Sequence, residues 1–273
     1  MKVILSRKGF DASYGGYPSP IFPDGGLISL PILLNDDGMK YSDLKWENDK
    51  TYYDLMKDLN IKTINENSKC HLDPDIYKNV RKREIGWKAA FGQIGAAQSH
   101  LKNQGIEIGD LFLFFGWFRH MKEEENRKLS YYGPDLHVIF GYLQIGEIMN
   151  VQENTTVPDW LKEHPHCAPN TRTIKTNTIY ISRDRLSFNE DFLGYGIFDY
   201  DESLVLTKEG HSRTRWSLPD FFKEVRMSYH SKNSWRNDYF QSASRGQEFV
   251  IEGNHKIENW VKNLLMNNHR KKG

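Results

Sequence analysis

"GDLFLFFGWFRHMKEEENRKLSYYGPDLHVIFGYLQIGEIM", residues 109–149, is the stretch that decides the fold. Its two ends are dense in Leu, Ile and Phe, which is typical of buried strands, and a charged segment separates them. We therefore predict two strands flanking a charged insertion. Trp117, Arg119, Asp135 and His137 lie near the strand ends, and we assign them to substrate binding. The alternative is a plain hairpin whose charged loop faces solvent.

Further strands are predicted on both sides of this stretch, at residues 2–6, 25–33, 178–186 and 195–207. Apolar residues at helical spacing predict helices at 51–60, 85–105, 217–224 and 256–268, and Gly105 stands where a C-terminal cap is expected. Strands in runs with few helices between them predict an α+β fold. We expect a mixed or antiparallel, partly barrel-like sheet with flanking helices.

Composition narrows the classes of protein. The 37 Lys and Arg balance 36 Asp and Glu, so a nucleic-acid partner would have to meet a local basic patch. Two cysteines cannot form a disulfide framework, and no run is apolar enough to span a membrane. No linker divides the chain. We predict one cytoplasmic domain over residues 1–273 that does not contact a membrane.

The opening segment "SRKGFDASYGGYPSP", residues 6–20, carries much chemistry directly after a buried strand. We predict that Arg7 and Lys8 hold a phosphate and that Asp11 acts as acid or base. The neighbouring Ser6, Tyr14, Gly15 and Gly16 would then contact the substrate, because glycines let a backbone approach a ligand closely. The alternative is an ordinary surface loop in which Arg7 pairs with Asp11.

A third polar group comes from "GHSRTRWSLPDFF", residues 210–222, and "SASRGQEFVIEG", residues 242–253. Arg213, Arg215 and Trp216 offer phosphate-binding and stacking groups. Arg245, Gln247 and Glu248 form a polar cluster entering the strand "EFVI", and we assign Glu248 a catalytic role and the other two a role in substrate binding. Arg215 and Glu248 could equally form a structural ion pair.

Metal and cofactor motifs give a weaker signal. His164, His166 and Cys167 could bind zinc together with Cys70 or His71, but their spacing matches no standard zinc pattern. The common phosphate-loop, dinucleotide and metalloprotease motifs are absent from the sequence. We therefore predict no metal site and no cofactor, and leave open whether those three residues bind a metal.

The central strands resemble PUA-like barrels such as the EVE and ASCH domains. The pattern is a strand starting at "GD", a charged loop and a strand closing on "GYLQIGEI", and a PUA-like core would span about residues 106–207. The resemblance implies a pocket that holds a flipped or modified base against aromatic side chains.

Nearly the whole chain resembles the third of the nucleotide modification associated domain families. The blocks that carry the resemblance are "KVILSRKGFDASYGGYPSPIFPDG", "GDLFLFFGWF", "DLHVIFGYLQIGEI", "NTIYIS", "GYGIFDYDESLVLT", "RWSLPDFF" and "SRGQEFVIEG". Members occur beside base-modifying enzymes in phage and bacterial genomes. The resemblance implies a partner that is DNA or a nucleotide carrying modified bases, in DNA modification or phage defence.

Two functional hypotheses follow. The first, which we favour, is an enzyme that modifies a nucleotide or DNA base or excises a modified base, with Trp117 or Trp216 stacking the base. Its support is that polar groups cluster at several separate strand ends. The second is a non-catalytic reader that binds a modified base in a PUA-like aromatic pocket.

Overall fold

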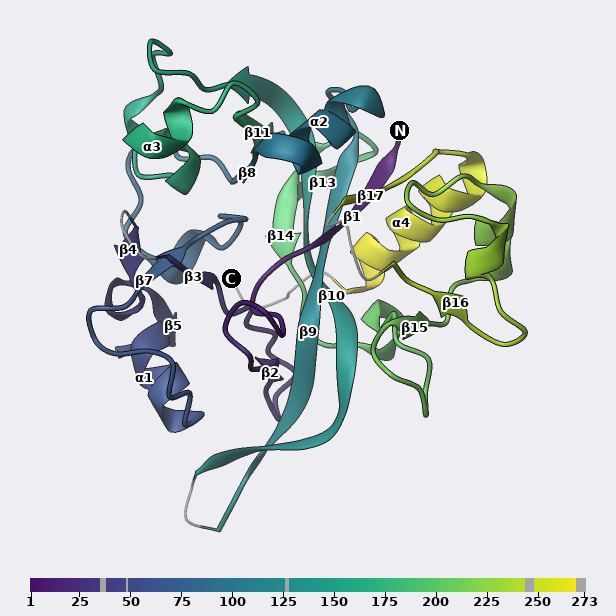
Figure 1. Cartoon of the computed structure of the whole chain (residues 1–273), viewed down its shortest axis with the longest axis horizontal. Coiled ribbons are helices and arrows are strands. Elements are labelled where there is room, and N and C mark those ends of the chain that lie inside the picture. The colour runs from purple at the N-terminus through teal and green to yellow at the C-terminus, as the bar shows by residue number, and fades with distance from the viewer. Residues whose placement is uncertain (35–37, 48, 126–127, 244–247, 269–273) are drawn as a thin grey trace.

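A computed structural model describes residues 1–34, 38–47, 49–125, 128–243 and 248–268 (Figure 1). Its centre is built by the apolar runs singled out in the sequence, β1 (Val3–Arg7), β9 (Leu111–Glu123) and β10 (Leu129–Asn150). β1 pairs with β9 in parallel, and β9 pairs with β10 as a long antiparallel hairpin. Both hairpin strands continue through most of the charged segment, so the ladder is longer than the apolar pattern predicts.

The described strands of the main sheet run in the order β17-β1-β9-β10-β11-β8, with β2 paired to β9 and β14 paired to β10. The sheet is mixed and curls into a half-barrel, so the predicted α+β class is confirmed. The bounds of its other strands are β2 (Ser19–Ile21), β8 (Ala90–Gln93), β11 (Thr178–Ser182), β14 (Tyr195–Ile197) and β17 (Glu248–Ile251).

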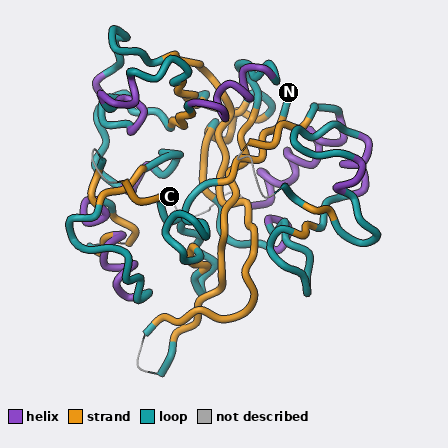
Figure 2. Tube along the Cα trace, in the orientation of Figure 1, coloured by secondary structure: helices purple, strands orange, loops and turns teal. Residues whose placement is uncertain are grey.

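Short strands form small sheets outside this core. Figure 2 shows them among the loop segments on both sides of the central strands. They are β3 (Ile32–Leu34), β4 (Met39–Lys40), β5 (Lys45–Glu47), β6 (Lys50–Thr51), β7 (Lys69–His71), β12 (Arg185–Leu186), β13 (Asn189–Leu193), β15 (Arg215–Trp216) and β16 (Phe240–Gln241).

The described α-helices are α1 (Tyr52–Asp58), α2 (Gly95–Asn103), α3 (Pro169–Arg172) and α4 (His255–Asn268). The 3-10 helices are Tyr41–Asp43, Lys78–Val80, Asp159–Leu161, Pro165–Cys167, Glu202–Leu204, Asp220–Glu224 and Lys232–Ser234. Thr51 begins α1, since its hydroxyl accepts from the Asp54 amide while the Asp54 carboxylate accepts from the Thr51 amide. No helix of the described segments is long and apolar enough to cross a membrane.

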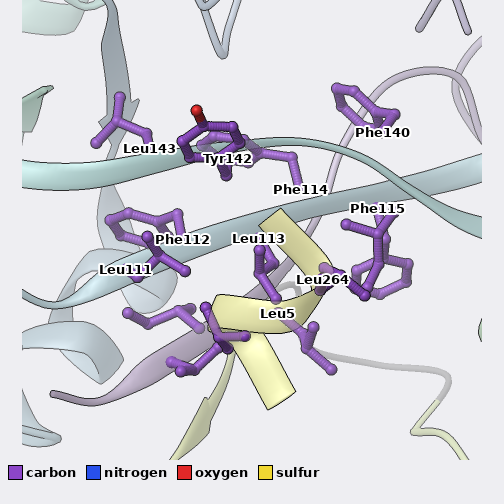
Figure 3. Close-up of a cluster of buried hydrophobic side chains, with 14 of the residues drawn as sticks. Leu5, Leu111, Phe112, Leu113, Phe114, Phe115, Phe140, Tyr142, Leu143 and Leu264 are labelled. Atoms are coloured by element: carbon purple, nitrogen blue, oxygen red, sulfur yellow. The ribbon is translucent and has the colours of Figure 1, made fainter. Parts of the chain in front are cut away.

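The two faces of the central strands pack against different partners, because successive side chains of a strand point to opposite sides. On one face, Leu5, Leu113 and Phe115 lie beside Leu264 of α4, as Figure 3 shows. The other face carries Phe112 and Phe114, which pack with the Phe91 ring of β8 at centroid distances of 4.9 and 5.3 Å. This alternation decides where the polar side chains of β1 and β17 go.

Some predicted elements differ from the structure. Residues 90–93 form strand β8, so only the second half of the helix predicted at 85–105 is helical. The predicted strand at 25–33 is confined to β3 at its end, and residues 217–224 give a 3-10 helix over Asp220–Glu224 in place of an α-helix. Tertiary pairing overrides local propensity in each segment: β8, for example, completes its hydrogen bonds with β11.

Candidate functional site

A buried polar group lies on the β8 side of the sheet. Ser6 of β1 pairs in register with Glu248 of β17. The Glu248 side chain is 1% exposed, and its Oε1 accepts hydrogen bonds from Lys8 Nζ at 2.9 Å and Gln93 Nε2 at 2.6 Å. The Lys8 ammonium also lies 4.4 Å from the centre of the Phe91 ring. Three segments far apart in the sequence thus hold one carboxylate.

Two polar atoms of this group lack hydrogen-bond partners within the part of the chain that the structure describes. They are Glu248 Oε2 and Ser6 Oγ, and both are buried. An unpaired buried acceptor costs free energy, and such atoms are uncommon except where water, an ion or a ligand completes them. Among the described residues, Glu248 Oε2 is therefore a buried carboxylate oxygen to which no donor is bonded.

An aromatic residue with a strained backbone borders this group. Tyr229 has φ 63°, a backbone value that residues with a Cβ rarely adopt, and the residue is 52% exposed. Its ring lies 4.2 Å from the His100 ring, whose Nε2 is 2.9 Å from Ser228 Oγ. Burial lowers the pKa of His100, and the charge of Glu248 opposes this shift.

The opening residues separate at the end of β1. Lys8 turns toward Glu248 and pairs with it, while Arg7 lies within electrostatic range of Asp11, Arg213 and, with a smaller effect, Glu248. Burial lowers the pKa of Arg7, Asp11 opposes the shift and Arg213 adds to it. Arg7 and Lys8 thus leave the strand on opposite sides, so one phosphate held by both would have to bridge the edge of the sheet.

Asp11 organises the loop that follows. Its Oδ1 accepts hydrogen bonds from the Ser13 amide at 2.7 Å and the Tyr14 amide at 2.8 Å. The Asp11 amide and carbonyl bond to Tyr14 and Gly16, which closes the turn. Tyr14 is 57% exposed. Gly15 and Gly16 have φ 96° and 74°, so both are fixed by turn geometry.

Of the hairpin residues that we assigned to substrate binding, Trp117, Arg119 and Asp135 are each in contact with a charged side chain. Trp117 is half-buried, with the Arg213 guanidinium 4.1 Å from its ring centre. Arg119 pairs with Asp135 at 2.8 Å across the β9–β10 ladder. One face of Trp117 is therefore already covered by a cation, and the charges of Arg119 and Asp135 balance each other.

His137 and Trp216 lie inside the core. Trp216 is fully buried against Phe115 and Phe249, and its indole N–H donates to His137 Nδ1 at 3.1 Å. Burial, with a smaller contribution from Arg7 and Arg213, lowers the pKa of His137 to about 3. In this arrangement the Trp216 ring is covered by protein and offers no face to a base.

The residues predicted around Glu248 separate as well. Arg215 is exposed, with its guanidinium 5.0 Å from the Tyr239 ring centre, and Glu248 pairs with Lys8, so the alternative Arg215–Glu248 ion pair is wrong. Arg245 and Gln247 lie outside the described residues.

A cluster of histidines and a carboxylate lies next to the Glu248 group. The ligand atoms of His71, Asp73 and His166 all lie within 4.8 Å of one another. Asp73 Oδ1 accepts the Gly92 amide at 2.8 Å and lies 3.4 Å from His164 Nε2. Gly92 and Gln93, consecutive residues of β8, therefore connect this cluster with Glu248.

Burial and neighbouring charges shift the pKa values of Asp73, His71 and His166. Burial raises the pKa of Asp73, but the hydrogen bond from His164 and the nearby histidines outweigh it and lower that pKa below its ordinary range. Burial lowers the pKa of His166 to about 3 and lowers that of His71, in both cases against the charge of Asp73. The two cysteines do not join: Cys70 packs in the cluster around α1, and Cys167 packs with Val151 and Ile179.

Sequence reasoning missed Gln93, His71 with Asp73 as a pair, and the His100–Tyr229 contact. For the His71–Asp73 pair, the sequence offered two similar signals, "HLD" at residues 71–73 and "HPH" at residues 164–166. Residues two apart in an extended chain have their side chains on the same side. Gln93 and Tyr229 carry no such signal, because their roles depend on pairing between distant segments.

Residues 2–252 match the family model described as nucleotide modification associated domain 3. The chain belongs to this family. No curated protein and no solved structure matches it.

Membership in the nucleotide modification associated domain 3 family connects the chain with nucleotide modification. The match begins directly before β1 and ends directly after β17, so it includes both strands that build the Ser6–Lys8–Glu248 group. It also includes every residue of the His71–Asp73–His166 cluster.

Proposed function

We propose that this nucleotide modification associated domain is an enzyme acting on a modified nucleotide or DNA base, by modifying the base or by excising it, in a DNA-modification or phage-defence context. The observation that carries the proposal is the Glu248 carboxylate, buried and fixed at Oε1 by Lys8 and Gln93 with Oε2 unpartnered among the described residues. A positioned carboxylate with one free oxygen can accept a proton from a base, a hydroxyl or an attacking water.

The two predicted carboxylates differ in what surrounds them. Asp11 Oδ1 already accepts two backbone amides and holds a turn. Glu248 has no backbone amide on its carboxylate in the described residues, and its contacts are an ammonium and a side-chain amide. We therefore propose Glu248 as acid or base, Lys8 as its partner and a contact for substrate phosphate, and Asp11 as the residue that shapes the loop.

The first experiment measures nucleosides and free bases by mass spectrometry after the protein is incubated with plain DNA and with hypermodified phage DNA. A changed nucleoside or a released base supports an enzyme. We expect Glu248→Gln to lower turnover about 10²–10⁴-fold, the contribution of one acid–base group, and Asp11→Asn to retain most of it. Turnover that survives Glu248→Gln and is lost in Asp11→Asn would contradict the assignment.

Glu248→Gln leaves the buried Lys8 ammonium without its counter-charge, which can destabilise the fold. The Lys8→Met/Glu248→Gln double variant removes both charges and serves as the folding control. A folded double variant that turns over substrate at the wild-type rate would also contradict the role of Glu248.

The exposed ring of Tyr229 favours a second candidate, a reader that stacks a modified base without changing it. For a reader, we expect mass spectrometry to find no changed nucleoside. In an electrophoretic mobility assay, the protein should retard modified DNA and leave plain DNA unretarded. Tyr229→Ala should weaken that binding by roughly 1–3 kcal/mol, the scale of one base–aromatic stack. Trp117→Ala gives the matched comparison, since each ring has one neighbour stacked near it, Arg213 on Trp117 and His100 on Tyr229, but Trp117 is half-buried and Tyr229 is exposed. Equal affinity for modified and plain DNA would exclude the reader.

A further inference from the structure

The hydrogen bonds around His166 fix where its proton lies. Asn177 Nδ2 donates to the carbonyls of Val151 at 3.0 Å and His166 at 2.8 Å, and carbonyls only accept. Asn177 Oδ1 therefore faces His166 Nδ1, 2.9 Å away, and Nδ1 must carry the proton. The lone pair of the neutral ring is then on Nε2, on the side of Asp73.

That lone pair faces a second acceptor. His166 Nε2 lies 3.6 Å from Asp73 Oδ2, and both side chains are 4% exposed. Asp73 Oδ1 is turned away, because it accepts the Gly92 amide and lies beside His164 Nε2. His164 Nδ1 accepts the His166 amide at 3.3 Å, so the proton of the neutral His164 ring lies on Nε2, 3.4 Å from Asp73 Oδ1. A buried carboxylate oxygen and a ring lone pair repel each other unless a cation lies between them.

The spacing suits a metal ion. Two ligands at 2.0–2.2 Å from a tetrahedral zinc ion are about 3.4 Å apart, close to the 3.6 Å between Asp73 Oδ2 and His166 Nε2. The ligand atom of His71 completes a triangle whose corners all lie within 4.8 Å of one another. A cavity of about 410 Å³, lined by Leu72, His164 and Pro165 among others, lies alongside.

We propose that His71, Asp73 and His166 bind one divalent transition-metal ion and leave at least one coordination position open. Two imidazoles and one carboxylate favour Zn²⁺, Fe²⁺ or Co²⁺ over Mg²⁺ and Ca²⁺, which prefer all-oxygen ligands. Catalytic metal sites typically have three protein ligands and an open position. In structural sites the protein supplies the fourth ligand as well. His164 and Asn177 are positioning residues that act through Asp73 and His166.

The proposed metal site lies next to the Glu248 group, because two consecutive residues of β8 connect them. Gly92 holds Asp73 and the next residue, Gln93, holds Glu248. Lys8 lies within electrostatic range of His71, and its charge is balanced by Glu248. The metal proposal does not rest on the enzymatic function, since binding of the ion is measured without any substrate.

The test uses the full chain, stripped with a chelator and titrated with Co²⁺, Zn²⁺ and Mg²⁺. We expect one Co²⁺ per chain with visible absorption of a four- or five-coordinate ion, displaced by Zn²⁺ and not by Mg²⁺. Asp73→Asn and His166→Gln should weaken Zn²⁺ binding at least about 100-fold. Cys167→Ser, a control at the residue that the sequence offered as a ligand, should bind like wild type.

Asp73→Asn also separates lost binding from lost folding. The asparagine keeps an oxygen for the Gly92 amide and places an N–H opposite His166 Nε2, so the metal-free variant should melt at or above the midpoint of metal-free wild type. A lower midpoint would mean that a protonated histidine already occupies the place of the ion, and would overturn the proposal. Wild type that binds neither Co²⁺ nor Zn²⁺, or binds Mg²⁺ equally well, would overturn it too.

Discussion

His137 combines burial with a hydrogen bond that only its neutral ring can accept. An indole N–H donates and never accepts, so the hydrogen bond from Trp216 Nε1 to His137 requires an unprotonated Nδ1; the same N–H also donates to the Arg213 carbonyl at 3.1 Å. Burial and the positive charges of Arg7 and Arg213 act in the same direction and lower the pKa of His137 to about 3. Protonation of His137 Nδ1 therefore removes its hydrogen bond with Trp216, while the indole keeps the Arg213 carbonyl as an acceptor.

This coupling predicts a pH dependence of stability. Below the ordinary histidine pKa of 6.5, the unfolded chain binds a proton at His137 that the folded chain does not bind, so stability falls as the pH is lowered toward 3. Between pH 7 and pH 5 this residue alone should lower the free energy of unfolding by about 2 kcal/mol. Urea unfolding at both pH values measures the loss. His137→Asn keeps an acceptor for Trp216 without titrating, so its loss should be smaller by that amount, and an equal loss would contradict the assignment.

At the scale of elements, the loop after β1 depends on two glycines for different reasons. A Cβ on Gly15 would lie 2.2 Å from the Phe10 ring, whereas a Cβ on Gly16 would meet nothing within 4 Å. Both residues have positive φ. Close packing against Phe10 and backbone conformation therefore both constrain Gly15, and conformation alone constrains Gly16.

Gly15→Ala and Gly16→Ala form a matched pair. We expect Gly16→Ala to lower the free energy of unfolding by about 1–2 kcal/mol, the left-handed backbone cost, and Gly15→Ala by about 2–5 kcal/mol because a clash is added. Chemical denaturation of both variants measures the difference. Equal stabilities, combined with loss of ligand binding only in Gly15→Ala, would show instead that Gly15 serves close approach of a ligand.

Elements with an unambiguous apolar pattern were predictable from the sequence. β1, β9, β10 and β11 are dense in β-branched and aromatic residues, and α4 repeats buried residues at helical spacing. β8 was not, because Ala90 and Gly92 sit in an Ala- and Gly-rich run whose strand character comes from pairing with β11 and from the Gly92 amide on Asp73. Local sequence contains neither interaction.

At the scale of the whole molecule, the candidate site shows the same division. Ser6, Lys8 and Glu248 were predictable as polar residues at strand ends, but their meeting depends on the pairing of β1 with β17 across about 240 residues. Gln93 and the His71–Asp73–His166 cluster come from further segments, and His166 lies over Gly92, where a Cβ would be 2.2 Å from its ring. Such convergence follows from topology, which single-sequence patterns do not specify.

The molecule contains two large buried clusters that share strands. One surrounds the central sheet, and the other joins α1 and β7 to Phe10, Phe22 and Met121. Phe10 follows β1 by three residues and Met121 lies within β9, so the chain passes from one cluster to the other inside single elements. Separate unfolding of the α1 cluster would expose part of β9, and the two clusters should therefore unfold together.

We accordingly predict one cooperative transition for the whole chain. The difference in fluorescence between wild type and Trp46→Phe reports on the α1 cluster, because Trp46 stacks on Phe22 at 4.9 Å. Its urea midpoint should equal the midpoint measured by far-ultraviolet circular dichroism. The matched probe for the sheet is Trp216→Phe, whose indole is fully buried between Phe115 and Phe249. An earlier midpoint at Trp46 alone would divide residues 1–273 into two folding units, with the shared strand β9 remaining folded when the α1 cluster is lost.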